Sequence, residues 1–166
     1  MMTLEKFEEA SERVKEVILP TNLIYSEYYS AQTGAKIYFK PENMQYTGAY
    51  KVRGAYYKIS TLTKEEREKG LITASAGNHA QGVAYAAKIY GCKAIIVMPN
   101  TTPLIKVNRT KSYGAEVILH GDIYDDCLLY TSSAWESKSA ATNFGVADSS
   151  ANTRISLGPA MESIFT

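Results

Sequence analysis

The stretch KAIIVMP, residues 93–99, carries five consecutive apolar residues before its proline. A continuous run of this kind is typical of a strand that is buried on both faces, because a half-buried strand alternates apolar and polar residues. LITA at 71–74 is a second short apolar run, and EVILH at 116–120 is a third. The sequence therefore predicts three strands of one sheet.

The segments between these strands have helical features. A helix is expected from about His79 to Ile89, closed by Gly91, and another from Pro103 to Gly114. Strands that alternate with helices indicate parallel pairing, because parallel neighbours need a long crossover connection. The predicted fold class is α/β, an open parallel sheet with helices on both faces.

The amino-terminal part is less regular. The spacing of apolar residues predicts a helix over 4–17 that ends at Pro20, then a helix over 25–32 that Gly34 stops. KIYFK at 36–40 alternates and predicts a strand. Two more helices are expected, one through Ala55, Tyr56 and Ile59 and one over TKEEREKG at 63–70.

The composition changes near Asp126. Residues 127–166 are rich in Ser, Ala and Thr, and their apolar residues keep neither helical nor strand periodicity, so we expect them to lie outside the fold. CLLYTS at 127–132 can be encoded by a transposon end used in preparing sequencing libraries, which would make this tail an out-of-frame artefact. A natural disordered tail is the alternative.

Charge and cysteine content narrow the classes of partner. Eighteen basic and seventeen acidic side chains leave a net charge of +1 without a block of like charge, so neither nucleic acid nor a membrane surface is indicated as a partner. Cys92 and Cys127 lie far apart and have no metal-ligand spacing. No apolar stretch approaches the length of a membrane span. We expect a cytoplasmic protein that binds a small molecule and no metal.

The loop TASAGNHAQG at 73–82 follows a strand and opens a helix. The N–H groups around Gly77, Asn78 and His79 are therefore expected to be available to an anion. Gly77 lets the chain turn, while Ser75 and Asn78 carry short side chains that can donate to an oxygen. The alternative is a capped turn in which Ser75 and Asn78 bond only to local backbone.

The loop TGAYKVRGA at 47–55 places Lys51 beyond the strand at 36–40, where an open parallel sheet gathers ligands. A lysine there can form an imine with an aldehyde. Burial beside Tyr50 and the positive charge of Arg53 would both disfavour the ammonium form and leave a nucleophilic amine. The alternative is an ordinary surface lysine.

Three motifs occur in order: KPENMQYTGAYKVRGA at 40–55, ITASAGNHAQGVAYAA at 72–87 and VILHGD at 117–122. Together they resemble the threonine dehydratase (threonine ammonia-lyase) family, of the tryptophan-synthase-like, fold type II group of pyridoxal-phosphate enzymes. The resemblance covers roughly residues 4–126. It implies pyridoxal 5'-phosphate as the cofactor, held by Lys51 as an internal Schiff base.

The resemblance also implies roles for the neighbouring residues. Asn78 would lie against the phenolic oxygen of the cofactor ring. Tyr50 would keep the aromatic wall, although the family commonly reads Ser-Phe where this chain has Ala49 and Tyr50. The residues implied to bind the substrate are Ser75, Ala76, Gly77, Asn78 and His79.

The implied reaction is a β-elimination in which the Lys51 amine removes the α-proton and the substrate loses its β-hydroxyl. Threonine would give 2-oxobutanoate and ammonia, and serine is the other candidate substrate. Related serine racemases carry a second serine where this chain has Ala76, and a methyl group cannot exchange a proton. Dehydration is therefore favoured over racemisation. The alternative to an enzyme is a non-catalytic module that kept the fold and serves in small-molecule binding or in assembly.

The resemblance divides the chain into three parts. Residues 1–50 would belong to the large cofactor domain, 51–126 would form a nearly complete small α/β domain, and 127–166 would be a tail without family resemblance. The family's glycine-rich loop for the cofactor phosphate has no counterpart, because the sequence contains no run of glycines. We therefore expect a truncated large domain, poor cofactor binding and no lyase activity for this chain alone, and a homo-oligomer at full length. Biosynthetic and catabolic roles, towards isoleucine or in threonine breakdown, both stay open.

Residues beside these loops are assigned structural roles. Glu42, Asn43 and Gln45 are expected to shape the loop before Lys51. Lys106, Arg109 and Lys111 are interpreted as a solvated helix face, with an anionic effector or a subunit contact left open.

Overall fold

The computed structural model describes residues 3–139, 145–147 and 155–156 of the 166. The described residues contain a five-stranded sheet of order β5-β4-β3-β6-β7. The first four of these strands pair in parallel, and β7 is antiparallel to β6. The strands are β3 (Leu71–Ala74), β4 (Ala94–Met98), β5 (Glu116–Leu119), β6 (Gly145–Ala147) and β7 (Ile155–Ser156). The predicted α/β class with a parallel sheet is confirmed.

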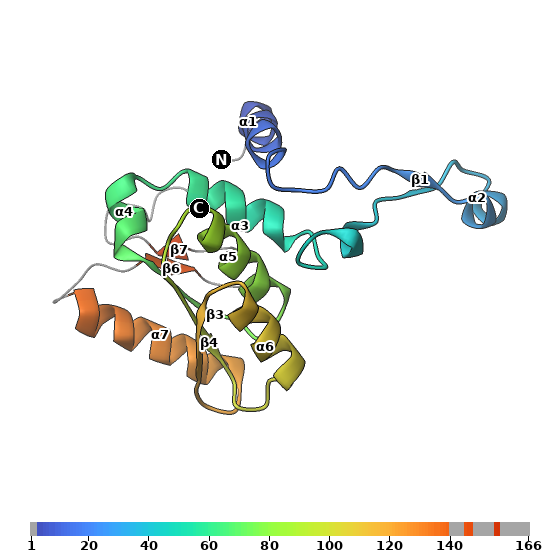
Figure 1. Cartoon of the computed structure of the whole chain (residues 1–166). Helices are drawn as coiled ribbons and strands as arrows, with labels where there is room; N and C mark the ends of the chain where they lie inside the picture. The colour runs from blue at the N-terminus through green and yellow to red at the C-terminus, as the bar shows by residue number, and fades with distance from the viewer. Residues whose placement is uncertain (1–2, 140–144, 148–154, 157–166) are drawn as a thin grey trace.

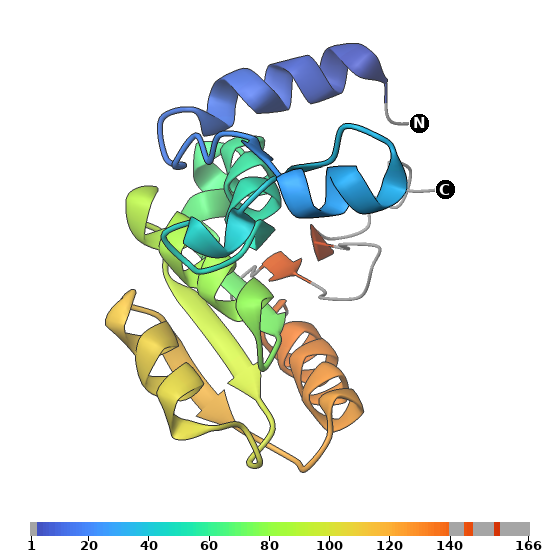
Figure 2. The same cartoon turned by 90° about the vertical axis from the view of Figure 1, so that its right-hand side faces the viewer.

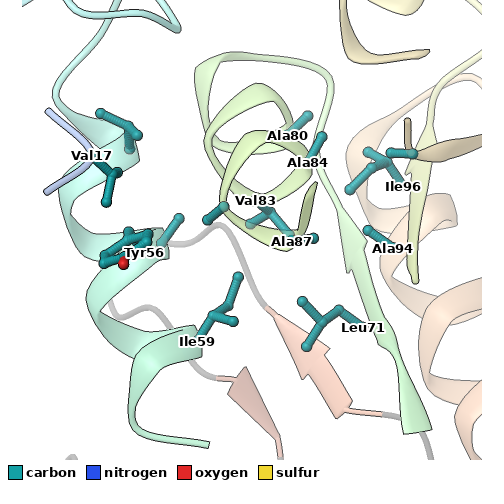
Figure 3. Packing of buried hydrophobic residues seen from close by; sticks show 14 of the residues in the cluster. Val17, Tyr56, Ile59, Leu71, Ala80, Val83, Ala84, Ala87, Ala94 and Ile96 are labelled. Atoms are coloured by element: carbon teal, nitrogen blue, oxygen red, sulfur yellow. The ribbon is translucent and has the colours of Figure 1, made fainter. Parts of the chain in front are cut away.

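Helices α3 (Lys51–Ser60), α5 (Asn78–Ile89) and α6 (Leu104–Ser112) lie on one side of the sheet (Figures 1 and 2). Helix α1 (Leu4–Val14) packs on α3, and α4 (Lys64–Lys69) leads from α3 into β3. The core of this layer is shown in Figure 3, where α5 lies between α3 and the strands. Its residues include Tyr56, Ile59, Leu71, Ala80, Val83, Ala84, Ala87, Ala94 and Ile96.

Helix α7 (Tyr124–Ser139) covers the other face of the sheet (Figure 2). Neighbouring residues of a strand point to opposite faces, so β4 sends Ile96 towards α5 and sends Ile95 and Val97 towards α7. All five residues of β4 are buried for this reason. The prediction of helices on both faces is therefore confirmed.

The expectation that the fold ends at Asp126 is wrong for the part of the tail that α7 contains. Cys127 and Thr131 are fully buried, and Ala134 completes the same face of the helix. The two most deeply buried side chains, those of Cys127 and Thr131, are small or polar, and the larger Tyr124 and Tyr130 that pack on the same core are only partly buried, so the sequence shows no clear apolar periodicity. The buried Thr131 hydroxyl lies 3.0 Å from the Cys127 carbonyl and 2.8 Å from that of Leu128, which lets a polar residue occupy the face. The rest of the tail, apart from β6 and β7, lies outside the described residues.

The segment between α1 and α3 forms an arm that reaches away from the sheet (Figure 1). It contains β1 (Ile24–Tyr25), α2 (Glu27–Thr33), β2 (Tyr38–Phe39) and the short 3-10 helix η1 (Glu42–Met44). Gly34 ends α2 with a positive φ of 69°, as predicted. The helix begins two residues later than predicted, because the Ser26 hydroxyl accepts from the Tyr29 N–H and caps it there. Tyr25 instead pairs with Tyr38 across the two strands.

Candidate active site

The two predicted loops meet where α3 and α5 begin. Lys51 is the first residue of α3, and Asn78 is the first residue of α5. A β-carbon placed on Gly82 would lie 3.1 Å from both the carbonyl carbon and the carbonyl oxygen of Lys51. Asn78 lies one helical turn before Gly82, about 6 Å along the axis and on the same face. The packing of the two helices therefore brings Asn78 to the side of α5 that faces Lys51.

Lys51 is half-buried, and its amine lies beside an aromatic ring. Its Nζ is 5.4 Å from the centroid of the Tyr50 ring, which is within the range of a cation–π contact. Tyr50 immediately precedes α3, and its side chain is largely exposed. The amine can therefore be reached from solvent along an aromatic wall.

Arg53 does not have the role expected for it. Its guanidinium donates two hydrogen bonds to Glu42, from Nε to Oε2 and from Nη2 to Oε1, both of 2.8 Å. Because the two charges compensate each other, Arg53 does not present an unpaired positive charge to Lys51. This pairing lowers the pKa of Glu42 to about 2, against the opposing effect of burial.

Gln45 and Glu42 support the loop before Lys51, as expected. The buried Gln45 amide accepts a 3.0 Å hydrogen bond from the Leu19 N–H and donates one of 2.7 Å to the Leu19 carbonyl. Glu42 also accepts from the Thr21 hydroxyl at 2.6 Å. These contacts tie the loop to the segment that follows α1.

Ser75 caps the turn that precedes α5. Its hydroxyl oxygen accepts from the N–H of Ala80 at 3.2 Å and from the N–H of Gly77 at 3.4 Å. The alternative of a locally capped turn is thus correct for Ser75. The Gly77 N–H was expected to be available to an anion, but it donates to the Ser75 hydroxyl instead. The hydroxyl proton of Ser75 remains able to donate. The Asn78 side chain is exposed, whereas His79 is buried.

Gly77 leaves open space beside this turn. Its φ of −131° is negative, so no left-handed conformation calls for glycine here. A β-carbon there would meet nothing within 4 Å, and Ala76 next to it is only partly buried. This space borders the first residue of α5, where a ligand could approach the helix start.

Gly82 was not identified as a site residue from the sequence. A glycine in the interior of a predicted helix is destabilising relative to alanine. Its presence there was the signal from which a close approach of another backbone segment could have been inferred. Within the described residues, no group of three His, Cys, Asp or Glu side chains is placed to hold a metal ion. None of the described helices combines the length and apolar character needed to cross a membrane.

Comparison with known proteins places this geometry in a family. The family described as "Pyridoxal-phosphate dependent enzyme" matches residues 14–163. An L-threonine ammonia-lyase of Thermotoga maritima is 53% identical over 126 residues, which are 76% of this chain and 31% of that protein. The catabolic L-threonine dehydratase TdcB of Staphylococcus aureus is 50% identical over 131 residues, which are 78% of this chain and 38% of that protein.

Solved structures agree in fold. A threonine deaminase isoform from Solanum lycopersicum has a TM-score of 0.74 at 36% identity, over 83% of this chain and 39% of that one. Serine racemase from Dictyostelium discoideum has a TM-score of 0.79 at 33% identity, over 89% of this chain and 47% of that one. The chain belongs to the family of pyridoxal-phosphate-dependent enzymes. It spans about a third of the length of the curated relatives, 31% and 38%.

The residues present fit one end of pyridoxal phosphate. A reachable amine at Lys51, the Asn78 amide and the open space at Gly77 suit the aldehyde and the phenolic oxygen of its ring. The phosphate end is not accounted for, because the sequence has no run of glycines that could cradle it.

Proposed function

We propose that this chain is the amino-terminal part of a pyridoxal-phosphate-dependent dehydratase that converts L-threonine, or L-serine, into a 2-oxo acid and ammonia. The observation that carries the proposal is the contact of Gly82 with the Lys51 backbone, because it packs the start of α3 against the first turns of α5, the helix that Asn78 begins. Two relatives that share about half of their aligned residues with this chain are named L-threonine ammonia-lyase and L-threonine dehydratase. These names support the same reaction.

Lys51 and Asn78 would hold the cofactor, with Tyr50 beside the amine. When bound, pyridoxal phosphate supplies an electron-withdrawing ring that accepts negative charge from the α-carbon of the substrate. Once the substrate amine has displaced it from the cofactor, the free Lys51 Nζ would take the α-proton, for which it must be uncharged at that moment. The substrate carboxylate would lie at the start of α5, where the helix dipole favours an anion and the Ser75 hydroxyl can donate.

Racemisation is the second candidate reaction, favoured by the similarity to the Dictyostelium discoideum serine racemase. Ala76 opposes it. A racemase must return a proton to the α-carbon from the face opposite the lysine, and the methyl group of Ala76 carries no exchangeable proton. We therefore expect the longer natural protein that contains this segment to convert L-serine into pyruvate and to form little D-serine. D-serine at a rate comparable to pyruvate would refute this assignment.

Borohydride reduction of the longer natural protein in the presence of pyridoxal phosphate, followed by peptide mapping, tests the proposal at its centre. We expect the cofactor to be fixed on Lys51, and we expect the Lys51→Ala chain to retain none at that peptide. Reaction spread over exposed lysines such as Lys111 at equal yield would refute a dedicated site. A non-catalytic binding module would show ligand binding without attachment to Lys51.

We further propose that residues 1–166 alone are inactive, since they offer no glycine-rich loop for the phosphate. Assay of this chain with L-threonine for 2-oxobutanoate tests this, with the longer natural protein as the positive control. Turnover by the 166-residue chain at the rate of the longer protein would contradict it.

A further inference from the structure

The loop that leads into Lys51 is held by residues that follow it by more than sixty positions. The carbonyl oxygen of Tyr46 accepts a 3.1 Å hydrogen bond from the Tyr113 hydroxyl and a 3.4 Å hydrogen bond from Arg109 Nη2. Arg109 lies on α6, and Tyr113 is its carboxyl-terminal cap residue. A carbonyl oxygen has two lone pairs, so this carbonyl has its full complement of donors.

The Arg109 guanidinium also covers the next turn of the loop. A β-carbon on Gly48 would lie 3.8 Å from both terminal nitrogens of Arg109. Gly48 has a φ of 71°, a conformation that side chains disfavour. Arg109 thus spans the loop from Tyr46 to Gly48 and is not simply part of a solvated helix face.

Aromatic packing connects the same three segments. The Tyr85 ring, on α5, stacks on Tyr46 with centroids 5.7 Å apart and meets Tyr113 edge-on at 5.5 Å. Burial raises the pKa of Tyr85, which is consistent with its place between the two rings. Helix α5 therefore contacts the loop through Tyr85 and contacts Lys51 through Gly82.

The few residues between Tyr46 and Lys51 leave little freedom. The Gly48 N–H donates to the Gln45 carbonyl at 2.7 Å, and Thr47 is buried with its hydroxyl 3.4 Å from the Ala49 carbonyl. A displacement of the Tyr46 carbonyl would consequently move the first turn of α3.

We propose that Arg109 and Tyr113 are positioning residues for Lys51, acting through the Tyr46 carbonyl. Neither touches the amine. They fix the loop against α6 and so set where the amine stands relative to the start of α5. The inference rests on the proposed role of Lys51 in holding a carbonyl cofactor.

Tyr113→Phe is the sharpest test, because it removes the hydroxyl and keeps the ring on Tyr85. Tyr28→Phe is its control, since Tyr28 is exposed on the arm with its ring on Tyr29. Amide hydrogen exchange of the full chain without cofactor is measured over residues 42–50 and over the strands β3 and β4. Loss of one hydrogen bond corresponds to roughly three- to tenfold faster exchange. We expect this increase over residues 42–50 and no increase in β3 or β4.

Arg109→Met repeats the test for the second donor, with Lys111→Met as the matched control on the same helix. Both cations are exposed, and only Arg109 reaches the loop. Acetylation of Lys51 by acetic anhydride, mapped by mass spectrometry, reports the amine in the absence of cofactor. Its rate should change in Arg109→Met and Tyr113→Phe, because the amine takes a different position, and stay unchanged in both controls.

The proposal would be overturned by unchanged exchange over 42–50 in both variants, or by faster loop exchange with unchanged acetylation of Lys51. Faster exchange throughout the strands would indicate a general structural role and would also overturn it. Failure of the longer natural protein to take up pyridoxal phosphate on Lys51 would instead refute the proposed function, because the exchange and acetylation measurements use no cofactor.

Discussion

Gly82 lies directly against the backbone of Lys51, at a separation that a β-carbon would reduce to 3.1 Å. Lys51 opens α3 and Gly82 lies in the second turn of α5, so this contact determines how closely the two predicted site segments approach. The atoms in contact belong to the main chain, which cannot rotate away as a flexible side chain can.

Substitution Gly82→Ala should therefore separate the two helices near Lys51. Overpacking is expected to exceed the gain in helix propensity, for a net loss of about 1 kcal/mol in the free energy of unfolding, and to slow attachment of pyridoxal phosphate to Lys51. Gly54→Ala is the matched control, because Gly54 is exposed on α3 and its β-carbon would meet nothing within 4 Å. It should stabilise the chain by about 0.5 kcal/mol. Equal effects of the two changes in urea unfolding would contradict the close contact.

Glu42 should make stability depend on pH in the acidic range. Its pKa in the folded chain is about 2, below the ordinary value of 4.5, because Arg53 donates to its ionised form. A lowered pKa stabilises the fold above about pH 4.5, and this contribution is lost as the pH falls towards 2. The shift corresponds to about 3 kcal/mol at most.

Thermal or urea unfolding between pH 6 and pH 2, compared for the unsubstituted chain and Glu42→Gln, measures this contribution. The two profiles should differ most above pH 4.5 and converge at the acidic end. Profiles that run parallel over the whole range would show that the pair with Arg53 contributes nothing to stability.

Substitutions of Ser75 and Asn78 should distinguish a residue that stabilises the fold from a residue that binds the ligand. Ser75→Ala removes the acceptor of the Ala80 and Gly77 N–H groups and should cost about 1 kcal/mol of unfolding free energy. Asn78 is exposed, so Asn78→Ala should change stability by less than about 0.5 kcal/mol and still weaken cofactor attachment. Unfolding curves and attachment to Lys51 are measured on the same samples. A large stability loss in Asn78→Ala would count against a binding role.

Helix α7 should be required for a stable sheet. Thr131→Lys places a charge on its buried face against Ile95 and Val97 and should destabilise the chain by several kcal/mol. Ser132→Lys, on the exposed side of the same turn, should be nearly neutral. Circular dichroism and thermal unfolding distinguish them. If Thr131→Lys unfolded at the same temperature as Ser132→Lys, α7 would not cover the sheet in solution.

Much of the local structure could be predicted from residue patterns. The bounds of β3 agree with the prediction, those of α5 differ by one residue at its start, and those of β4 differ by one residue at each end. These elements were predictable because β4 is apolar throughout, β3 is apolar except for Thr73, and α5 follows a turn-forming loop. The start of α2 was placed wrongly because one serine cap, Ser26, decided it. Helix α7 was missed because the residues it buries fully, Cys127 and Thr131, are small or polar, while its tyrosines on the same core are only partly buried.

The sequence by itself determined the α/β class and the chemistry of the two loops, since an amine at Lys51 and an amide at Asn78 are properties of residue type and local position. Only the tertiary structure decided that Arg53 is paired with Glu42, that Gly82 touches Lys51 and that Arg109 and Tyr113 hold Tyr46. These relationships join residues far apart in the chain, and helix packing sets them through contacts that no local pattern encodes.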